Sequence, residues 1–290
     1  MNNHTQLSTE WKVWIQSNLD KGCDETSLIH DMVKANFDPV VAGVAVLQAL
    51  GAKAAALSGA NTQPEAQAGP YVYETPRFPQ AGGTIYTADR NVRVALRVAQ
   101  PVIALLDGLF SDEECDELIR LSRVKLQRST IVDPVTGQHQ VIDDRSSFGT
   151  FFTLNENAFI AKLDTRIAEV MHWSIENGEG LQILNYKVGG EYKTHFDYFP
   201  PEDQGSAAHI TKGGQRVSTL VIYLSDVERG GETIFPNMQL SIVPKKGSAV
   251  YFEYCNSLGQ VDAQTLHGGK AVMAGEKWIA TKWMRQRAYR

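Results

Sequence analysis

The sequence predicts a mainly β protein with flanking helices, a sandwich or jelly roll, preceded by a small N-terminal three-helix bundle. Beyond Gly180 short apolar runs alternate with Gly, Pro and Asn, a pattern typical of strands and turns. The N-terminal residues instead place their apolar side chains at helical spacing. Between these regions the composition shifts to Ala, Gly, Pro, Gln and Thr, as in a linker. We therefore expect a helical head over residues 1–51, a linker over 52–83 and a β-rich domain over 84–290.

Three short helices are expected in the head. Gly22 ends the first, and Asp24 can cap the second. Asp38-Pro39 starts the third, because an acidic N-cap followed by proline is a strong start signal. The apolar residues of the three helices are Trp11, Trp14, Ile15 and Leu19, then Leu28, Ile29, Met32 and Val33, then Val40, Val41, Val44 and Leu47. The bundle loosely resembles a ubiquitin-associated module and could dock a partner protein. We favour a packing role, since an apolar stripe is more often core than interface.

The β-rich domain begins with two expected strands and two expected helices. Residues 92–98 alternate apolar and polar side chains, as a half-buried strand does, and 102–106 form a second run. Ser111 and Glu114 form a capping box that starts one helix, and 158–171 is the second. Both helices are expected to cover the outside of a sheet. The strands expected after them are 181–187, 217–224, 240–243, 248–254 and 278–284.

Composition and charge exclude several classes of protein. With 43% hydrophobic and 21% charged residues, the chain has the composition of an ordinary soluble globular protein. The net charge of −5 arises from interspersed charges, and no basic stripe indicates a nucleic-acid partner. The apolar stretches are too short to span a bilayer, and the first residues lack the pattern of a secretory signal. We therefore expect a cytoplasmic protein with no membrane partner, whose three scattered cysteines are buried free thiols.

Two histidines and an aspartate have the spacing of a metal site. His195 and Asp197 are two positions apart, so on an extended segment both side chains point to the same side. His267 follows 70 positions after Asp197 (267 − 197) and would complete the set by folding back. Two imidazoles and a carboxylate form the facial triad of non-haem Fe(II) enzymes, although zinc accepts the same ligands. A lone histidine is more often structural, but an aspartate between aromatic residues is costly to bury without a cation.

Lys277 and Lys282 lie on opposite faces of one expected strand. Whichever face is the core, one of these two lysines must point inward. A buried ammonium needs an anion, which is either the carboxylate of a ligand or an Asp or Glu of the protein. The alternation of side chains does not choose between the two lysines.

From about residue 101 to the C-terminus, a collinear series of motifs resembles the collagen-type prolyl 4-hydroxylase family. The helical head lies outside this resemblance. The motifs are LQILNY at 181–186, YKTHFDYF at 192–199, GQRVSTL at 214–220, YLSDV at 223–227, GGETIFP at 230–236, PKKG at 244–247, LHGG at 266–269 and GEKWIATKW at 275–283.

The resemblance implies a double-stranded β-helix that binds Fe(II) and 2-oxoglutarate, so that residues 84–290 would be a dioxygenase domain. It implies that His195, Asp197 and His267 are the metal ligands. Lys277 would bind the distal carboxylate of 2-oxoglutarate, together with Tyr186 and Thr233. The other possibility is that Thr233 is a turn residue and Tyr186 a packing aromatic. O₂ would be the second cosubstrate and ascorbate the reductant.

The resemblance also suggests substrate contacts. In the family a mobile flap, corresponding here to residues 128–149, closes over a peptide. The residues that match positions at the end of this flap or along the peptide groove are Arg145, Ser147, Tyr192, Arg216 and Trp283. The alternatives are solvated surface charges for the two arginines and a core aromatic at the sheet edge for Trp283. The stretch 200–213 departs from the family pattern as a long loop, and we interpret its His209 as a loop histidine.

The implied activity is hydroxylation of prolyl residues, at the 4-position, in a peptide or protein substrate, with release of succinate and CO₂. Two alternatives stay open. The same oxygenase chemistry could act on lysyl residues, a free amino acid or a small metabolite. The barrel could also be vestigial in a binding module whose head recruits a partner, although an intact triad with Lys277 argues against this.

Overall fold

The computed structural model describes residues 8–20, 23–57, 70–132, 139–140, 145–203 and 205–289. The chain divides into two compact units, Met1–Glu65 and Ala66–Arg290. Among the described residues, no helix combines the length and the apolar character that a membrane crossing requires. The domain limits predicted from composition stay a prediction.

The first unit contains the expected helices α1 (Thr9–Asp20), α2 (Glu25–Lys34) and α3 (Pro39–Leu57). As predicted, Asp24 caps α2 by accepting a hydrogen bond from the Ser27 backbone. One prediction about α3 is wrong, because Val44 and Leu47 are 49% and 60% exposed. This helix is apolar on most sides, so periodicity does not select its buried face. The buried residues of the unit are Ile15, Leu19, Leu28, Met32, Phe37, Ala42, Ala45 and Val46.

The second unit is built on a nine-stranded sheet and a four-stranded sheet, and all its recorded strand pairings are antiparallel. In order across the large sheet, the strands are β1 (Thr84–Tyr86), β2 (Asn91–Val98), β3 (Ile103–Asp107), β14 (Ala249–Glu253), β10 (Arg216–Tyr223), β17 (Lys277–Arg285), β8 (Leu181–Tyr186), β7 (Phe148–Phe152) and β4 (Gln127–Arg128). The small sheet contains β13 (Leu240–Ile242), β12 (Thr233–Phe235), β15 (His267–Gly269) and β9 (Tyr192–His195). Two further pairs join β11 (Arg229–Gly230) to β16 (Val272–Ala274), and β5 (Ile131–Val132) to β6 (His139–Gln140).

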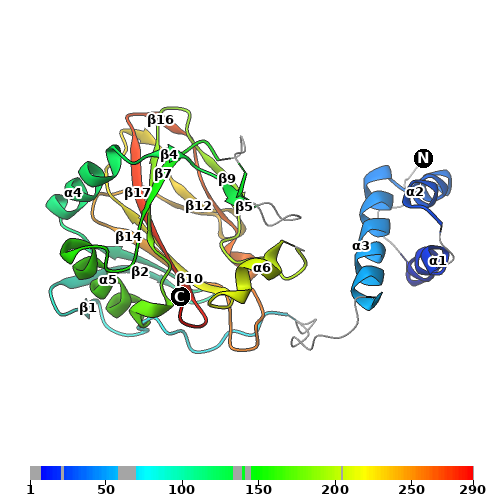
Figure 1. The fold of residues 1–290 in the computed structure, drawn as a ribbon, viewed down its shortest axis with the longest axis horizontal. Helices are drawn as coiled ribbons and strands as arrows, with labels where there is room; N and C mark the ends of the chain where they lie inside the picture. The colour runs from blue at the N-terminus through cyan, green and yellow to red at the C-terminus, as the bar shows by residue number, and fades with distance from the viewer. Residues whose placement is uncertain are drawn as a thin grey trace. The chain divides into compact units, whose positions relative to one another are not determined.

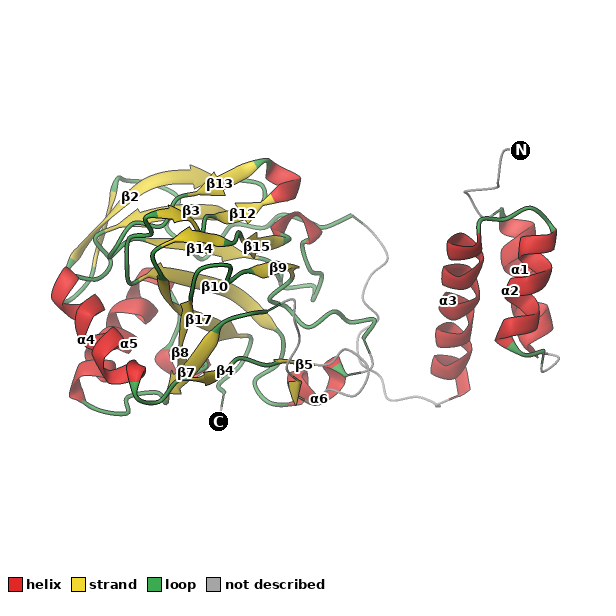
Figure 2. Cartoon of the chain, turned by 90° about the horizontal axis from the view of Figure 1, so that it is seen from above, coloured by secondary structure: helices red, strands yellow, loops and turns green. Residues whose placement is uncertain are grey.

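The two faces of the large sheet belong to two different cores. One face packs against α4 (Asp112–Arg123) and α5 (Ala158–Met171), which lie together on one side of the sheet (Figures 1 and 2). The other face packs against the small sheet, through Phe235 of β12 and Ile242 of β13. Because both faces are covered, the central strands β8, β10 and β17 are almost wholly buried. The predicted jelly roll with covering helices is confirmed, and the site lies between the sheets.

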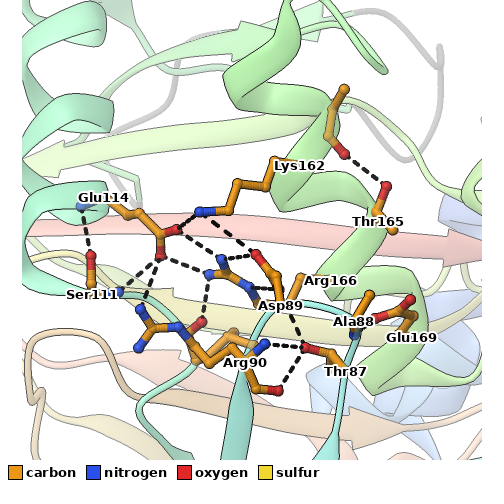
Figure 3. A network of polar contacts seen from close by, with 12 residues as sticks. Thr87, Ala88, Asp89, Arg90, Ser111, Glu114, Lys162, Thr165, Arg166 and Glu169 are labelled. Atoms are coloured by element: carbon orange, nitrogen blue, oxygen red, sulfur yellow. Dashed lines mark hydrogen bonds and ion pairs between the residues drawn. The ribbon is translucent and has the colours of Figure 1, made fainter.

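A buried ion-pair network fixes the two helices to the turn between β1 and β2 (Figure 3). Arg166 of α5 is 1% exposed and donates to both Glu114 of α4, at 2.7 and 2.8 Å, and Asp89 of the turn. Burial alone would raise the pKa of Glu114, but Arg166 and Lys162 lower it to about 2. The predicted capping box is present as well, since Ser111 accepts from the Glu114 backbone.

Three local features differ from the sequence-based expectation. The end of the predicted linker lies against the β-rich unit, where Phe78 is buried and stacks on Tyr251. The predicted loop 200–213 contains a short helix, α6 (Ser206–Thr211). Cys23 is exposed and Cys255 is half-buried, so of the three cysteines only Cys115 is a fully buried thiol.

Candidate active site

Three donor groups converge where the small sheet meets the bend after β9. His195 ends β9 and His267 begins β15, and the register of the two strands makes these residues direct neighbours. Asp197 is buried in the bend that follows β9. The donor atoms of the three side chains all lie within 4.8 Å of one another. The structure therefore brings together residues that are far apart in the sequence, in an arrangement that could hold a metal ion.

Backbone carbonyls orient both imidazole rings. Nδ1 of His195 lies 2.8 Å from the carbonyl oxygen of Lys193, and Nδ1 of His267 lies 3.0 Å from that of Thr265. Since a carbonyl oxygen only accepts, each Nδ1 carries the proton and each Nε2 presents its lone pair. The two Nε2 atoms lie 3.6 and 3.5 Å from the carboxylate oxygens of Asp197. Metal-binding histidines are typically held in this way, so these residues fit a divalent ion.

The protonation states also suit metal binding. Burial lowers the pKa of His267 to about 4, so its ring is neutral at pH 7. Burial alone would raise the pKa of Asp197, but attraction to the imidazoles of His267 and His195 when these are protonated, and to Arg216, holds it well below its usual range. The hydroxyl of Thr219 donates to Oδ2 of Asp197 at 2.7 Å and lies 2.9 Å from the phenol oxygen of Tyr254. The ring of His267 is therefore neutral and the carboxylate of Asp197 is ionised, and these are the forms in which both side chains bind a metal ion.

Both lysines of β17 are buried, and each has a different partner. Lys282 is 1% exposed, and its ammonium lies 2.7 Å from the carboxylate of Asp164 on α5. Lys277 is 4% exposed and lines the pocket that contains the three donor groups. Among the described residues, no carboxylate lies within 4 Å of its Nζ. Burial lowers the pKa of Lys277 to about 8, against an attraction from Glu232. The pocket thus contains a buried ammonium that pairs with no carboxylate of the described residues.

Tyr186 and Thr233 line the same pocket beside Lys277. Nζ of Lys277 lies 5.7 Å from the ring centroid of Tyr186 and 5.8 Å from that of Tyr223. Thr233 accepts a hydrogen bond from the Tyr223 hydroxyl at 2.8 Å, which leaves its own proton for another acceptor. Gly269 lies against the ammonium, since a Cβ there would be 3.6 Å from Nζ. This end of the pocket therefore presents an ammonium and hydroxyl groups to an anion.

Of the five predicted substrate contacts, Arg145, Tyr192 and Trp283 line the pocket. Arg145 is 7% exposed, so it is no solvated surface charge. Its Nη1 donates to the carbonyl of Thr130 at 2.8 Å, and its Nη2 donates to Oε1 of Gln182 at 3.1 Å. Its guanidinium lies 4.7 Å from the ring centroid of Tyr192. The protein itself therefore uses both terminal nitrogens of Arg145.

The structure places the other two predicted contacts, Ser147 and Arg216, outside the pocket lining. Ser147 is fully buried and hydrogen-bonds another serine. Arg216 donates twice to Glu179, at 2.7 and 2.9 Å, and once to the carbonyl of Asp197, at 3.2 Å. Its guanidinium also lies 3.9 Å from the ring centroid of Trp283, which belongs to a central strand and not to the sheet edge. Arg216 thus contacts Trp283 and Asp197, two residues of the pocket wall, without lining the pocket itself.

Sequence reasoning missed three residues of this site. Gln182 lines the pocket, Thr219 hydrogen-bonds Asp197, and Glu179 holds Arg216. The first two had a usable signal, because each is a polar residue in the interior of a mainly apolar strand. A buried polar side chain needs a partner, which is often another group of the site.

The fold, the donor set and the comparisons with known proteins together define a class of protein, an oxygenase that uses Fe(II) and 2-oxoglutarate. The sequence model of the 2OG-Fe(II) oxygenase superfamily matches residues 181–285. In solved structures, the chain resembles the viral collagen prolyl hydroxylase of Paramecium Bursaria Chlorella virus-1 in its 2-oxoglutarate complex. The two are 32% identical with a TM-score of 0.50, over 63% of this chain and 95% of the viral chain.

Similar proteins of known family show to which group of these oxygenases the chain belongs. Prolyl 4-hydroxylase 1 of Arabidopsis thaliana is 39% identical over 213 residues, which cover 68% of this chain and 74% of the relative. Probable prolyl 4-hydroxylase 10 of the same plant is 36% identical over 210 residues, which cover 66% of this chain and 71% of the relative. The chain belongs to the prolyl 4-hydroxylase family of the 2OG-Fe(II) oxygenases. The resemblance inferred from the motifs is confirmed.

Proposed function

We propose that this chain hydroxylates prolyl residues, at the 4-position, in a peptide or protein. In this proposal His195, Asp197 and His267 bind Fe(II), and Lys277 binds the distal carboxylate of 2-oxoglutarate. One observation carries the proposal more than any other. Within the part of the chain that the structure describes, the buried ammonium of Lys277 has no paired carboxylate, and it lies in the same pocket as the His–Asp–His group.

In this proposal, the residues at one end of the pocket bind the cosubstrate, and those at the other end exclude water. When bound, the ferrous ion supplies the activation of oxygen that is coupled to decarboxylation of 2-oxoglutarate. At the inner end, Lys277 fixes the cosubstrate by charge, and the hydroxyls of Tyr186 and Thr233 donate to the same carboxylate. At the outer end, the aromatic rings of Tyr192 and Trp283 form walls that exclude water.

The substrate assignment rests on the family. Relatives bear the name prolyl 4-hydroxylase, and the viral relative is named a collagen prolyl hydroxylase. Ascorbate as reductant, the cytoplasmic location and partner docking through the N-terminal helices stay predictions.

An anaerobic titration tests the metal and the cosubstrate directly. The metal-free protein is titrated with Fe(II) and then with 2-oxoglutarate, and the absorption band of the ternary complex is followed. We expect both to bind the wild type, and Asp197→Ala to lose the metal. His209→Ala is the matched control, because this histidine stacks on Phe199 outside the donor set. Full iron binding by Asp197→Ala would refute the ligand assignment.

A peptide library then tests the reaction. Oxygen is admitted to the loaded enzyme with proline-rich peptides, lysine-containing peptides and free amino acids. We expect succinate, and the mass gain of one oxygen atom on prolyl residues only. Turnover on lysyl residues or on a free amino acid, with unmodified prolyl peptides, would replace the proposed substrate by one of the alternatives.

A further inference from the structure

We propose that a second cavity, on the helix-covered side of the large sheet, binds a small organic anion. Arg77 and Arg287 hold its carboxylate or phosphate group, and aromatic side chains pack against its ring. The cavity has a volume of about 520 Å³, a size typical of small-molecule sites. Its described lining residues are all different from those of the pocket with the His–Asp–His group, so it is a separate site.

The cavity lies between residues 71–77 and the ends of three adjacent strands. Ser218 of β10 and Glu253 of β14 belong to its wall, and Arg287 follows the end of β17. Ser218 and Glu253 are direct partners in the sheet. They share the face of Tyr251, whose side chain belongs to the core beneath α4 and α5. The active-site pocket, in contrast, lies on the face that is covered by the small sheet.

Hydrogen bonds fasten the segment that covers the cavity on both sides of it. At one end, the backbone N–H of Val72 donates to Oε1 of Gln260, and Nδ2 of Asn256 donates to the Val72 carbonyl, both at 3.0 Å. At the other end, the backbone N–H of Phe78 donates to Oε1 of Glu253 at 3.0 Å. The cavity is therefore preformed, and a preformed site loses less entropy when it binds a ligand.

Two arginines that line the cavity lack a protein acceptor. Within the described part of the second unit, the guanidinium groups of Arg77, Arg229 and Arg287 alone make neither a hydrogen bond nor an ion pair. Two of these three line the same cavity. Because the arginine side chain is always charged, the cavity contains two cations whose N–H groups are open. A bound carboxylate or phosphate supplies the acceptors that they lack.

Trp173, just after α5, orients one of the two guanidinium groups. The central carbon of the Arg77 guanidinium lies 3.9 Å from the centroid of the Trp173 ring. This contact uses the face of the guanidinium and leaves the N–H groups at its edge open. The N–H groups at the edge are the ones that pair with a carboxylate or a phosphate.

The cavity also contains two carboxylates, but the protein already uses both. Glu74 accepts from the backbone N–H and from the hydroxyl of Ser257. Oε1 of Glu253 accepts from a backbone N–H at 3.0 Å and from a tyrosine hydroxyl at 2.7 Å. The other oxygen of Glu253 has no partner among the described residues and opposes an anion in part. The open donors of two arginines still outnumber this one acceptor, which favours an anion over a cation.

The other residues of the lining indicate that the anion is an organic molecule. Three aromatic residues line the cavity, Tyr71, Tyr73 and Trp173, together with Val102 and Val217. The rings of Tyr71 and Tyr73 lie 4.9 Å apart, edge to face. Apolar and aromatic side chains beside a few charged groups are typical of sites for small organic molecules. A ring that carries the acidic group therefore fits this cavity better than an inorganic ion.

Calorimetric titration of the full chain tests the site with matched probes. Phenyl phosphate and benzoate are anions with a ring, and benzyl alcohol is a neutral molecule of similar shape. Fe(II) and 2-oxoglutarate are present under anaerobic conditions, so that the active-site pocket is occupied. We expect at least one of the two anions to bind, inorganic phosphate to bind at least tenfold more weakly, and benzyl alcohol not to bind.

The pattern among the probes identifies the acidic group. Binding of phenyl phosphate alone indicates a phosphate ester as the ligand, and binding of benzoate alone indicates a carboxylate. If neither anion binds, or if benzyl alcohol binds as tightly as the anions, the proposal is wrong. Inorganic phosphate that binds as tightly as phenyl phosphate would overturn the assignment of an organic ligand.

Substitutions of the two arginines locate the binding. Arg77→Gln and Arg287→Gln each remove one charge and should raise Kd for the bound anion about tenfold, the loss of one charged hydrogen bond. Arg229→Gln is the matched control, because Arg229 is also exposed but lies outside the cavity. It should change Kd by less than about twofold. Equal effects of the three substitutions would show a general effect of net charge and would remove the site.

Glu253→Gln tests the sign of the charge that the cavity prefers. The glutamine oxygen still accepts the two hydrogen bonds of Oε1, but the negative charge is gone. We expect Kd for the anion to fall severalfold, since repulsion by the carboxylate is removed. A rise in Kd, in a variant with an unchanged urea midpoint, would show a preference for cations and overturn the proposal. These measurements do not depend on prolyl hydroxylation.

Discussion

The two buried lysines of β17 should respond in opposite ways to the same substitution. At pH 7, burial of Lys277 disfavours its charged form, since its pKa falls from 10.5 to about 8. At 1.36 kcal/mol for each pKa unit, this corresponds to about 3 kcal/mol of lost stability. Lys277→Met keeps the unbranched shape and removes the charge, so it should stabilise the metal-free protein by up to about 3 kcal/mol. Lys282→Met instead leaves the buried Asp164 without its cation, which costs about 3–5 kcal/mol.

Urea unfolding of the three metal-free proteins measures both effects. The pH dependence provides a second check on Lys277. Between about pH 8 and 10.5 the unfolded chain binds more protons at this position than the folded one, so wild-type stability rises with pH. The advantage of Lys277→Met should therefore shrink across this range. The variant should also lose 2-oxoglutarate binding. Destabilisation of Lys277→Met to the same extent as Lys282→Met would refute the reasoning, because it would require a protein anion beside Lys277.

Four further effects are expected at the site and in the groups that support it. The affinity of the wild type for 2-oxoglutarate should fall as pH rises above about 8, where Lys277 loses its proton; a flat anaerobic titration between pH 7 and 9 would contradict this. Thr219→Val removes the hydrogen bond to Asp197 and should weaken Co(II) binding about tenfold or more, without lowering the melting temperature comparably. Arg166→Met leaves Glu114 buried without its main cation and should cost about 3–5 kcal/mol in urea unfolding, while metal affinity is unchanged. The stability contributed by Glu114 should be lost as pH falls from 4.5 toward 2, which acid unfolding would show.

Local signals in the sequence were sufficient for most elements of the fold. The capping box at Ser111 and the periodic apolar residues of 158–171 predict α4 and α5, because these helices have a single buried face. The short β15 strand, in contrast, has only three residues, two of them glycine. Its pairing with β9 is set by tertiary contacts, so the sequence predicted His267 as a ligand but not the strand that carries it.

The sequence did not predict in which direction several charged side chains point. Alternation along β17 could not choose between its two lysines, and the structure shows why, since helices cover one face of this strand and a second sheet covers the other. Arg145 and Arg216 illustrate the same limit. Their motifs placed them near the substrate, but whether a guanidinium contacts a ligand or another side chain depends on partners such as Gln182 and Glu179.

The two histidines and the aspartate of the candidate site are oriented by different kinds of contact. Each histidine donates its Nδ1 proton to the carbonyl two residues earlier in the chain, so its orientation is set locally by its own segment of the chain. Asp197 instead depends on Thr219 of β10, which belongs to the large sheet. The packing of the two sheets thus sets the position of the carboxylate and not the direction of the imidazoles. A substitution that loosens this packing should weaken metal binding through Asp197 first, while the two histidines still bind one ion together.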